Sequence, residues 1–231
     1  MCTASRGPPR AVHIARDLYG LLHAANVLPP YVLVGHSFGG LYVRAYAAAL
    51  PTDVAGLVLL EASHPDQFQR SQQARTEYAE LRTMYTVLPW AARLGGLRVS
   101  PSCRAPVSFP ATAARELHAA CAAAAGWTTQ QAEFDAIDAT MAQVRAAKLR
   151  PGLALVVVSG GAHVAASADW GVLQHELGLL SARSSFRIVP GGTHTSLWQD
   201  PAQAATCAAA ILSVALGPSP SIQNPITENS P

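Results

Sequence analysis

One short segment has the residue types and spacing that nucleophilic catalysis requires. Gly35-His36-Ser37-Phe38-Gly39 matches the pattern G-x-S-x-G and lies between an apolar stretch and a stretch with helical periodicity. In that context we expect Ser37 on a strained turn that exposes its hydroxyl, with glycines on either side because side chains there would collide. The N–H of Phe38 would face the charge that develops on an attacked carbonyl, as one oxyanion-hole donor. The alternative is a glycine-rich turn whose serine caps a helix.

A serine nucleophile needs a base, and the histidines differ in how well their positions suit that role. His194 follows the last predicted strand, in a loop of two glycines and a threonine, and we expect it to act on Ser37. The alternative is a histidine of a surface loop. His36 is expected to pack beneath the turn. His64 and His163 are expected on loops at the same edge of the sheet, where their side chains could contact substrate.

The carboxylate that would orient the base is less clear from the sequence. Glu61 stands directly after the second predicted strand, and we favour it as the acid. Asp169 is the first acid after the third predicted strand, but its position suits a helix N-cap. Asp66 remains a third candidate.

Strands that alternate with helices indicate an α/β fold with a mostly parallel sheet. Apolar periodicity predicts helices over 11–25, 38–50, 169–180 and 201–216, and strands over 31–34, 56–60, 153–158 and 185–189. The strand at 31–34 is expected to be buried on both faces. Because the carboxyl ends of parallel strands share one edge, Ser37, Glu61 and His194 should meet there.

The segment 65–150 contains no comparable strand and is expected to be a helical insertion. Within it, the Thr128-x-x-Gln131 pattern predicts a capping box that opens a helix to about Lys148. Its large apolar side chains could line a substrate pocket or form the insertion's own core: Phe68, Met84, Tyr85, Trp90, Phe109, Trp127 and Phe134.

Composition excludes several classes of protein. The chain has 231 residues, of which 50% are hydrophobic and 13% charged, and this excludes a wholly disordered chain. A net charge of +2 without a Lys/Arg run argues against nucleic-acid binding. No apolar stretch is long enough for a membrane span and the N-terminus lacks the apolar core of a signal peptide, so we expect a cytoplasmic protein.

The four cysteines show no C-x-x-C spacing, so neither a metal site nor a cofactor is expected. A disulfide between Cys103 and Cys121 is an open alternative, although two buried thiols are favoured.

Over residues 10–216 the chain resembles the alpha/beta-hydrolase-fold family. The resemblance rests on the segments 31–44 and 56–66, the order Ser…acid…His, the helical insertion where the family carries its cap, and the Asp-Pro that follows His194. The 31–44 and 56–66 segments are similar to capped, esterase-like bacterial members. The resemblance implies acylation of Ser37 followed by water attack, both aided by His194. Some members place the acid after the strand that follows the nucleophile strand, which supports Glu61.

The resemblance implies a division of the chain into a core (1–64 and 151–216) and a cap insertion (65–150). The Pro-, Ser- and Asn-rich composition from Gly217 onward predicts a disordered tail (217–231). The expected core is a sheet of about four mostly parallel strands with helices on both faces. In the family the nucleophile strand is the fifth of eight, whereas here it would be the first. We therefore expect a chain that starts inside the domain, lacks the loop that gives the second oxyanion N–H, and exposes an apolar edge at Tyr31–Val34 to dimerisation or aggregation.

Two functions remain after these considerations. The first is a serine hydrolase acting on a small-molecule ester or related acyl substrate. The alternative is a catalytically impaired, N-terminally truncated remnant or a ligand-binding module without turnover. The same fold also supports acyl transfer, haloperoxidation and C–C cleavage, which a serine nucleophile does not exclude.

Overall fold

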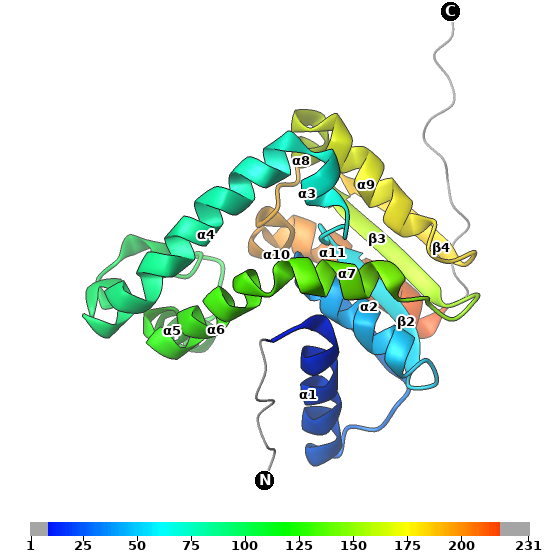
Figure 1. Cartoon of the computed structure of the whole chain (residues 1–231), viewed down its shortest axis with the longest axis horizontal. Coiled ribbons are helices and arrows are strands. Elements are labelled where there is room, and N and C mark those ends of the chain that lie inside the picture. The colour runs from blue at the N-terminus through cyan, green and yellow to red at the C-terminus, as the bar shows by residue number, and fades with distance from the viewer. Residues whose placement is uncertain (1–8, 218–231) are drawn as a thin grey trace, which may run out of the picture.

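A computed structural model describes residues 9–217 and places four strands in one parallel sheet (Figure 1). Along the sheet the strands follow their order in the chain: β1 (Tyr31–His36), β2 (Val54–Leu60), β3 (Ala154–Gly160) and β4 (Ser184–Val189). The register pairs His36 with Leu60 and Leu60 with Val158, so the carboxyl ends of three strands lie at one edge. The expected α/β fold with a parallel sheet of four strands is confirmed.

Each face of the sheet buries a different apolar cluster, because successive side chains of a strand point to opposite faces. One cluster contains Leu57, Leu59, Leu155 and Val157 and packs beneath α2 (Gly39–Ala49), with α1 (Ala11–Ala24) and α9 (Ala168–Gly178) completing that layer. The other cluster contains Val58, Leu60, Val156 and Val158 and packs against α11 (Pro201–Leu216). Helices therefore cover both faces, as Figure 1 shows.

The strand β1 differs from its expected environment. Leu33 and Gly35 are buried, but Val34 is 39% exposed and Val32 is only half-buried. The prediction that this strand is buried on both faces is therefore wrong. The physical reason is its place at the sheet edge, because no strand of residues 9–217 lies beyond it.

The four predicted helices of the core begin and end within two residues of their predicted bounds, at Ala11–Ala24, Gly39–Ala49, Ala168–Gly178 and Pro201–Leu216. Asn26, just after α1, adopts a left-handed conformation with φ of 54°, as is common at helix C-termini. Asp200 caps α11, since its Oδ1 accepts hydrogen bonds from the N–H groups of Ala202 and Gln203. Pro201 at the first helical position needs no N–H partner there.

Between β2 and β3 the chain forms α-helices and 3-10 turns and no strand. These are α3 (Gln67–Arg70), α4 (Gln72–Arg93), two 3-10 turns (Gly96–Arg98 and Pro101–Cys103), α5 (Ala111–Ala122), α6 (Ala124–Asp135) and α7 (Ile137–Ala146). In Figure 1 the helices α4, α5 and α6 extend to one side of the sheet, whereas α7 returns across α2.

The expected helix from Thr128 to about Lys148 is wrong. Thr128 lies inside α6, where its hydroxyl donates to the carbonyl of Ala124 rather than capping a helix. The chain then breaks at Ala136, between α6 and α7. A Ser/Thr hydroxyl can bond the preceding turn of a helix as readily as cap a new one, so the pattern does not separate the two cases.

Two expectations concern residues that lie outside the described range 9–217. The predicted absence of a signal peptide concerns residues 1–8, and the predicted disorder of the tail concerns residues 218–231 beyond Gly217. Within residues 9–217, no helix combines the length and the apolar character that crossing a membrane requires.

In addition to the helices above, the described chain contains α8 (Gly161–Ala166) and α10 (Ser196–Gln199).

Candidate active site

Ser37 occupies a strained turn between β1 and α2. Its φ is 54°, in the left-handed region that residues other than glycine rarely adopt. Two backbone hydrogen bonds hold the turn: the N–H of Ser37 donates to Leu60 O at 3.1 Å, and its carbonyl accepts from Ser63 N at 2.9 Å. Both partners belong to the end of β2 or to the loop after it, so the neighbouring strand fixes the strained turn.

Of the two glycines expected to be required around Ser37, the structure requires one. A Cβ on Gly35 would lie 2.6 Å from the carbonyl oxygen of Gly39, so only glycine fits there. A Cβ on Gly39 would meet no atom within 4 Å, and the expected collision at that position is wrong. Gly40 is the crowded position instead, because a Cβ there would lie 2.5 Å from the side chain of Ala62. The close approach is between α2 and the loop after β2.

Phe38 stands immediately before the first turn of α2. The first N–H groups of a helix have no intrahelical acceptor, which makes this end a favourable place for negative charge. The ring of Phe38 packs against that of Phe134 from the helical insertion, with centroids 4.9 Å apart. This contact joins the turn at Ser37 to the wall of the cavity above it.

Glu61 is fully buried at the end of β2 and also has a left-handed backbone, with φ of 44°. Its Oε1 atom accepts three hydrogen bonds: from Ser159 Oγ at 2.5 Å, from the N–H of Gly160 at 2.7 Å and from Trp170 Nε1 at 3.2 Å. These donors come from the end of β3 and from α9. They fix the carboxylate and replace the water that burial removes.

The other oxygen of Glu61 faces two histidines. His163 Nδ1 lies 2.6 Å from Oε2, and His194 Nδ1 lies 3.6 Å from the same atom. Burial alone would raise the pKa of Glu61, but the hydrogen bonds from His163, His194, Ser159 and Gly160 outweigh it and hold that pKa well below its usual range. Glu61 is therefore an anion that accepts a hydrogen bond from His163 and lies beside the imidazole of His194.

His163 is the histidine more closely bound to the carboxylate. Burial would lower the pKa of His163, but the hydrogen bond and charge of Glu61 outweigh this and raise it. The ring of His163 stacks on that of Trp170, with centroids 4.7 Å apart. Trp170 thus fixes both partners, since its indole N–H also donates to Glu61.

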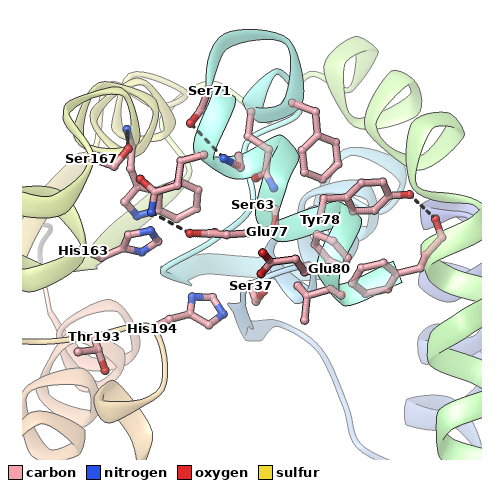
Figure 2. Close-up of a pocket in the computed structure, with 18 of the residues that line it drawn as sticks. Ser37, Ser63, Ser71, Glu77, Tyr78, Glu80, His163, Ser167, Thr193 and His194 are labelled. Atoms are coloured by element: carbon pink, nitrogen blue, oxygen red, sulfur yellow. Dashed lines mark hydrogen bonds between the residues drawn. The ribbon is translucent and has the colours of Figure 1, made fainter. Parts of the chain in front are cut away.

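His194 lies on the loop after β4, with its side chain 41% exposed. Its carbonyl accepts a hydrogen bond from His36 Nε2 at 2.8 Å, and the two rings lie 4.5 Å apart. His36 thus supports the loop that carries His194, in keeping with its expected place beneath the turn. In Figure 2 the His194 ring points toward Ser37. Hydrogen bonds at active sites often tighten only when substrate binds.

The other candidate acids lie elsewhere. Asp66 binds Arg145, whose Nε donates to it at 2.6 Å, and Asp169 is exposed in the first turn of α9. Within residues 9–217 neither carboxylate pairs with His194. His64 is buried beside Asp66 and does not line the cavity, and burial lowers its pKa to about 4.

A cavity of about 800 Å³ opens above Ser37, with Phe38, His163 and His194 in its wall (Figure 2). Of the apolar side chains expected to line it, the structure places four there: Phe68, Met84, Tyr85 and Phe134. Trp90 is instead 63% exposed with Arg93 over its ring, and Phe109 lies beside Trp198. The helix α4 also adds two carboxylates, Glu77 and Glu80.

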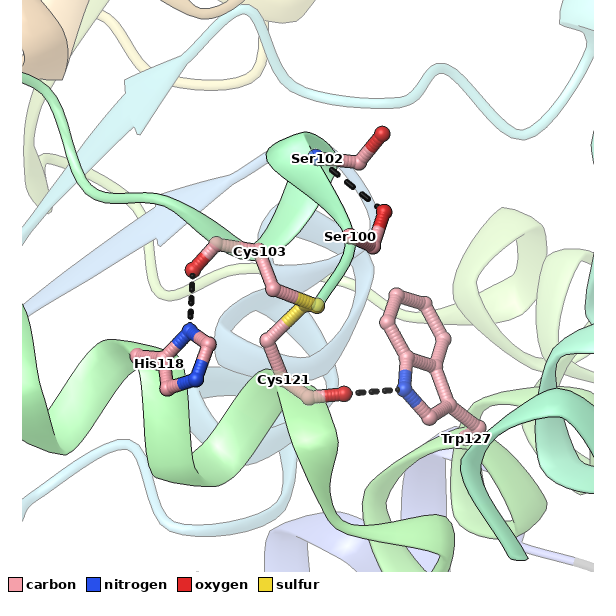
Figure 3. Close-up of a disulfide and its surroundings, with 6 residues drawn as sticks. All are labelled: Ser100, Ser102, Cys103, His118, Cys121 and Trp127. Atoms are coloured by element: carbon pink, nitrogen blue, oxygen red, sulfur yellow. Dashed lines mark hydrogen bonds between the residues drawn. A yellow bond between two sulfur atoms is a disulfide. The ribbon is translucent and has the colours of Figure 1, made fainter. Parts of the chain in front are cut away.

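The far end of the insertion is joined by a disulfide between Cys103 and Cys121 (Figure 3). The favoured expectation of two buried thiols is therefore wrong, because the 3-10 turn after α4 brings Cys103 beside α5. The indole N–H of Trp127 donates to the carbonyl of Cys121 at 2.6 Å, and His118 Nδ1 donates to that of Cys103 at 3.2 Å. Trp127 thus packs around the disulfide and not in the cavity.

The sequence of residues 3–208 matches the model of the Alpha/beta hydrolase family. The chain belongs to the alpha/beta hydrolase family. Solved structures of low sequence identity share the fold of this family member. A protein from a Nostoc species described as an alpha/beta hydrolase is 14% identical, with a TM-score of 0.68 over 90% of this chain and 73% of that one. A carboxylesterase structure from Nitrososphaera gargenis is 16% identical, with a TM-score of 0.57 over 92% and 74%.

Curated relatives match shorter segments of this hydrolase-family chain. An uncharacterised protein from Schizosaccharomyces pombe is 33% identical over 94 residues, which are 40% of this chain and 17% of that protein. The matched segments make up only 9% to 24% of the length of the curated relatives. These relatives therefore do not establish a substrate for this family member.

The sequence predicts that Ser37, Glu61 and His194 lie at one edge of the sheet. In the structure Ser37 and His194 line the same cavity, and His194 Nδ1 lies 3.6 Å from Glu61. The sequence does not predict the second histidine on Glu61, nor the donors Ser159 and Trp170. The segment 159–163 follows a predicted strand directly, so its position at the carboxyl edge was the one available signal. The side chain partnership could not be read from spacing, because Glu61 and His163 lie 102 residues apart.

Proposed function

We propose that this family member is a serine hydrolase that cleaves a small ester or related acyl compound through a covalent acyl-enzyme. The observation that carries the proposal is the convergence at one edge of the sheet of a strained serine, an exposed imidazole and a buried carboxylate. Ser37 is the nucleophile, His194 the general base and Glu61 the acid that orients it. The carboxylesterase neighbour agrees with this chemistry, although its likeness extends to the fold alone.

The reaction follows from these positions. Nδ1–H of His194 faces the Glu61 anion, so its Nε2 is free to accept the proton of Ser37 as Oγ attacks the substrate carbonyl. The N–H of Phe38 and the start of α2 stabilise the oxyanion. Nε2 then protonates the leaving alcohol, and the acyl group stays on Ser37. Water, deprotonated by the same nitrogen, attacks the acyl carbon, and Nε2 then returns the proton to Ser37 Oγ as the acyl bond breaks and the carboxylic acid leaves.

A fluorophosphonate probe tests the nucleophile directly. We expect the wild-type protein to be labelled and Ser37→Ala to remain unlabelled. Ser63→Ala is the matched control, because Ser63 lines the same cavity and should not be needed for labelling. A folded wild-type protein that takes up no label, or a label that persists in Ser37→Ala, would reject the proposed mechanism.

The second candidate function is a module that binds ligand with little or no turnover. It is favoured by the contacts of Glu61, because its Oε2 lies 2.6 Å from His163 Nδ1 and 3.6 Å from His194 Nδ1. The carboxylate is thus bound more closely to the histidine that the proposed hydrolysis does not use. Labelling of Ser37 combined with undetectable hydrolysis of short p-nitrophenyl esters would favour this alternative.

The outer edge of β1 offers a surface for self-association. Within residues 9–217 no strand pairs with that edge, and an unpaired edge beside the exposed Val34 is the kind of surface that pairs with another strand. We therefore propose self-association through Tyr31–Val34. Sedimentation should show a concentration-dependent dimer that Val34→Lys abolishes, with Val12→Lys, at an exposed position of α1, as the control.

The sequence and the structure point to different cellular compartments. The cytoplasmic location expected from the sequence rests on the composition of the N-terminus, whereas the disulfide favours an oxidising compartment. Thiol alkylation of protein taken from its native host, with and without reduction, distinguishes the two.

A further inference from the structure

Two imidazoles and one carboxylate converge on a small volume beside Ser37. Glu61, His163 and His194 each offer one ligand atom, and these atoms lie within 4.8 Å of one another. Only His194 and Glu61 have a part in the proposed hydrolysis. His163 is the unused member, although it has the shortest contact with the carboxylate.

The two oxygens of Glu61 have separate surroundings. Oε1 is occupied by donors from Ser159, Gly160 and Trp170, so it anchors the side chain. Within residues 9–217, Oε2 faces the two imidazoles alone and is the oxygen that could bind an ion. Metal-binding carboxylates typically have this arrangement, in which one set of partners orients the ligand and leaves a second oxygen for the metal.

We propose that Glu61, His163 and His194 form an inhibitory binding site for Zn²⁺ or a similar divalent transition-metal ion. Imidazole and carboxylate are zinc ligands at about 2.0–2.2 Å, and tetrahedral geometry places such ligand atoms about 3.3 Å apart. His194 Nδ1 is already 3.6 Å from Oε2, and His163 Nδ1 must withdraw from 2.6 Å to make room. Relative to Oε2 this is a movement of less than 1 Å, and the three ligand atoms, now within 4.8 Å of one another, must draw together around the ion.

The ion can enter from the cavity, because His163 and His194 both line it. A fourth ligand position would face the same space and be filled by water. Magnesium and calcium are not expected to bind, since they prefer more oxygen ligands than one buried carboxylate provides.

Inhibition follows from the tautomer of His194 and rests on the proposed function. An ion bound at Nδ1 displaces the proton from that nitrogen to water. The neutral imidazole must then carry its proton on Nε2, and such a nitrogen cannot accept the proton of Ser37. The ion also removes Glu61 as the partner that stabilises the imidazolium. Ser37 then loses its base without being blocked itself.

Zinc binding is measured first, without reference to activity. Calorimetric titration of the full chain with Zn²⁺ should show one strong site, retained in Ser37→Ala. His163→Phe keeps a ring to stack on Trp170 and removes the ligand nitrogen, so affinity should fall at least about tenfold. His118→Phe is the matched control, because it removes an imidazole beside the disulfide, and it should bind as the wild type does. Absence of binding, or equal binding by His163→Phe, would overturn the site.

Inhibition is measured next, on ester hydrolysis or on fluorophosphonate labelling. Zn²⁺ should inhibit the wild type and His118→Phe equally and reversibly by EDTA, whereas His163→Phe should need at least about tenfold more Zn²⁺. Tight binding without inhibition of an active enzyme would overturn the inhibitory role. If no activity is found at all, the proposed hydrolase function fails, and the titration of Ser37→Ala still decides the zinc site.

X-ray absorption of the zinc-loaded wild type removes dependence on any variant. The expected spectrum has two imidazole ligands and oxygen ligands in the first shell. One imidazole, or a thiolate ligand, would overturn the assignment even if His163→Phe fails to fold.

Discussion

The two walls of the cavity are built in opposite ways. On the sheet side, Glu61 is fully buried and its oxygens are held by donors from β3, α8 and α9. On the other side, α4 buries only three of its residues, and the side chains that it turns toward Ser37 include exposed Glu77, Glu80, Leu81 and Met84. One wall is fixed by buried hydrogen bonds, and the other is largely solvated.

This difference suggests where chemistry and selectivity reside. A reaction needs its groups held within a fraction of an ångström, which a sheet edge provides. A wall with few buried contacts tolerates substitution, because little packing is lost. We therefore expect substitutions on the sheet side to affect rate or stability strongly and those on α4 to affect the choice of substrate.

The largest effect is expected from Glu61→Gln. The amide cannot accept from two imidazoles and stabilise an imidazolium, so kcat for ester hydrolysis should fall by a factor of about 10³–10⁴ while KM changes little. Asp66→Asn and Asp169→Asn are controls that should stay within a few-fold of the wild type. A large loss in Asp169→Asn with a small one in Glu61→Gln would assign the acid to Asp169 instead.

Substitutions on the sheet side should also lower the free energy of unfolding more than substitutions on α4. Leu155→Ala, in the centre of the sheet at 1% exposure, should lower the free energy of unfolding by about 2–5 kcal/mol in urea titrations. Leu81→Ala, on α4 at 37% exposure, should lower it by less than about 1 kcal/mol and change KM for acyl chains of different length. Equal losses of stability would mean that α4 is packed as tightly as the core.

His64 gives the sheet side a pH dependence of its own. Burial, and to a smaller degree nearby Arg44, lowers the folded-state pKa of His64 from 6.5 to about 4, although Asp66 acts in the opposite direction. As pH falls from 6.5 towards 4 the unfolded chain binds a proton that the folded protein refuses. The free energy of unfolding should therefore fall over that range, by up to about 3 kcal/mol.

The measurement is urea unfolding of the wild type and of His64→Asn at several values of pH. Asn keeps an acceptor for the N–H of Asp66, which now donates to His64 Nδ1. The variant should lose less stability on acidification than the wild type, whereas His23→Gln on exposed α1 should behave as the wild type does. Parallel curves for wild type and His64→Asn would show that His64 is not the source.

The smallest effect is expected from the two carboxylates on α4. Replacement of both in Glu77→Gln/Glu80→Gln removes repulsion of negatively charged substrates from the cavity wall. Because both groups are exposed, kcat/KM for an ester with a carboxylate should rise only about two- to fivefold, and less at high salt. A neutral ester of the same size should show no change, and an equal rise for both esters would contradict the electrostatic reason.

The sequence was informative wherever a local pattern and a general rule of α/β sheets agreed. Ser37, Glu61 and His194 each follow a strand directly, so the shared edge of a parallel sheet predicts their meeting. The strands and core helices were predictable for a similar reason, because their apolar periodicity is local. Asp200-Pro201 marked the start of α11 through the ordinary chemistry of a helix cap.

The rest depended on contacts between distant segments. The shared use of Glu61 by two histidines arises only when β2, β3 and β4 lie side by side. The freedom at Gly39 and the crowding at Gly40 depend on how closely α2 approaches Ala62. The break at Ala136 and the disulfide depend on how the insertion folds back on itself, which no short pattern encodes.

The bond between Cys103 and Cys121 has a consequence for how the protein responds to its surroundings. It closes a loop with a sequence separation of 18 residues in a region where α5 buries none of its side chains. The covalent link supplements the small apolar cluster of Ala92, Leu97 and Cys103 that holds this end of the insertion together. Reducing agents would therefore loosen the outer end of the α4 wall first and leave the proton-transfer groups in place, so thiol chemistry would alter which molecules enter before it altered turnover.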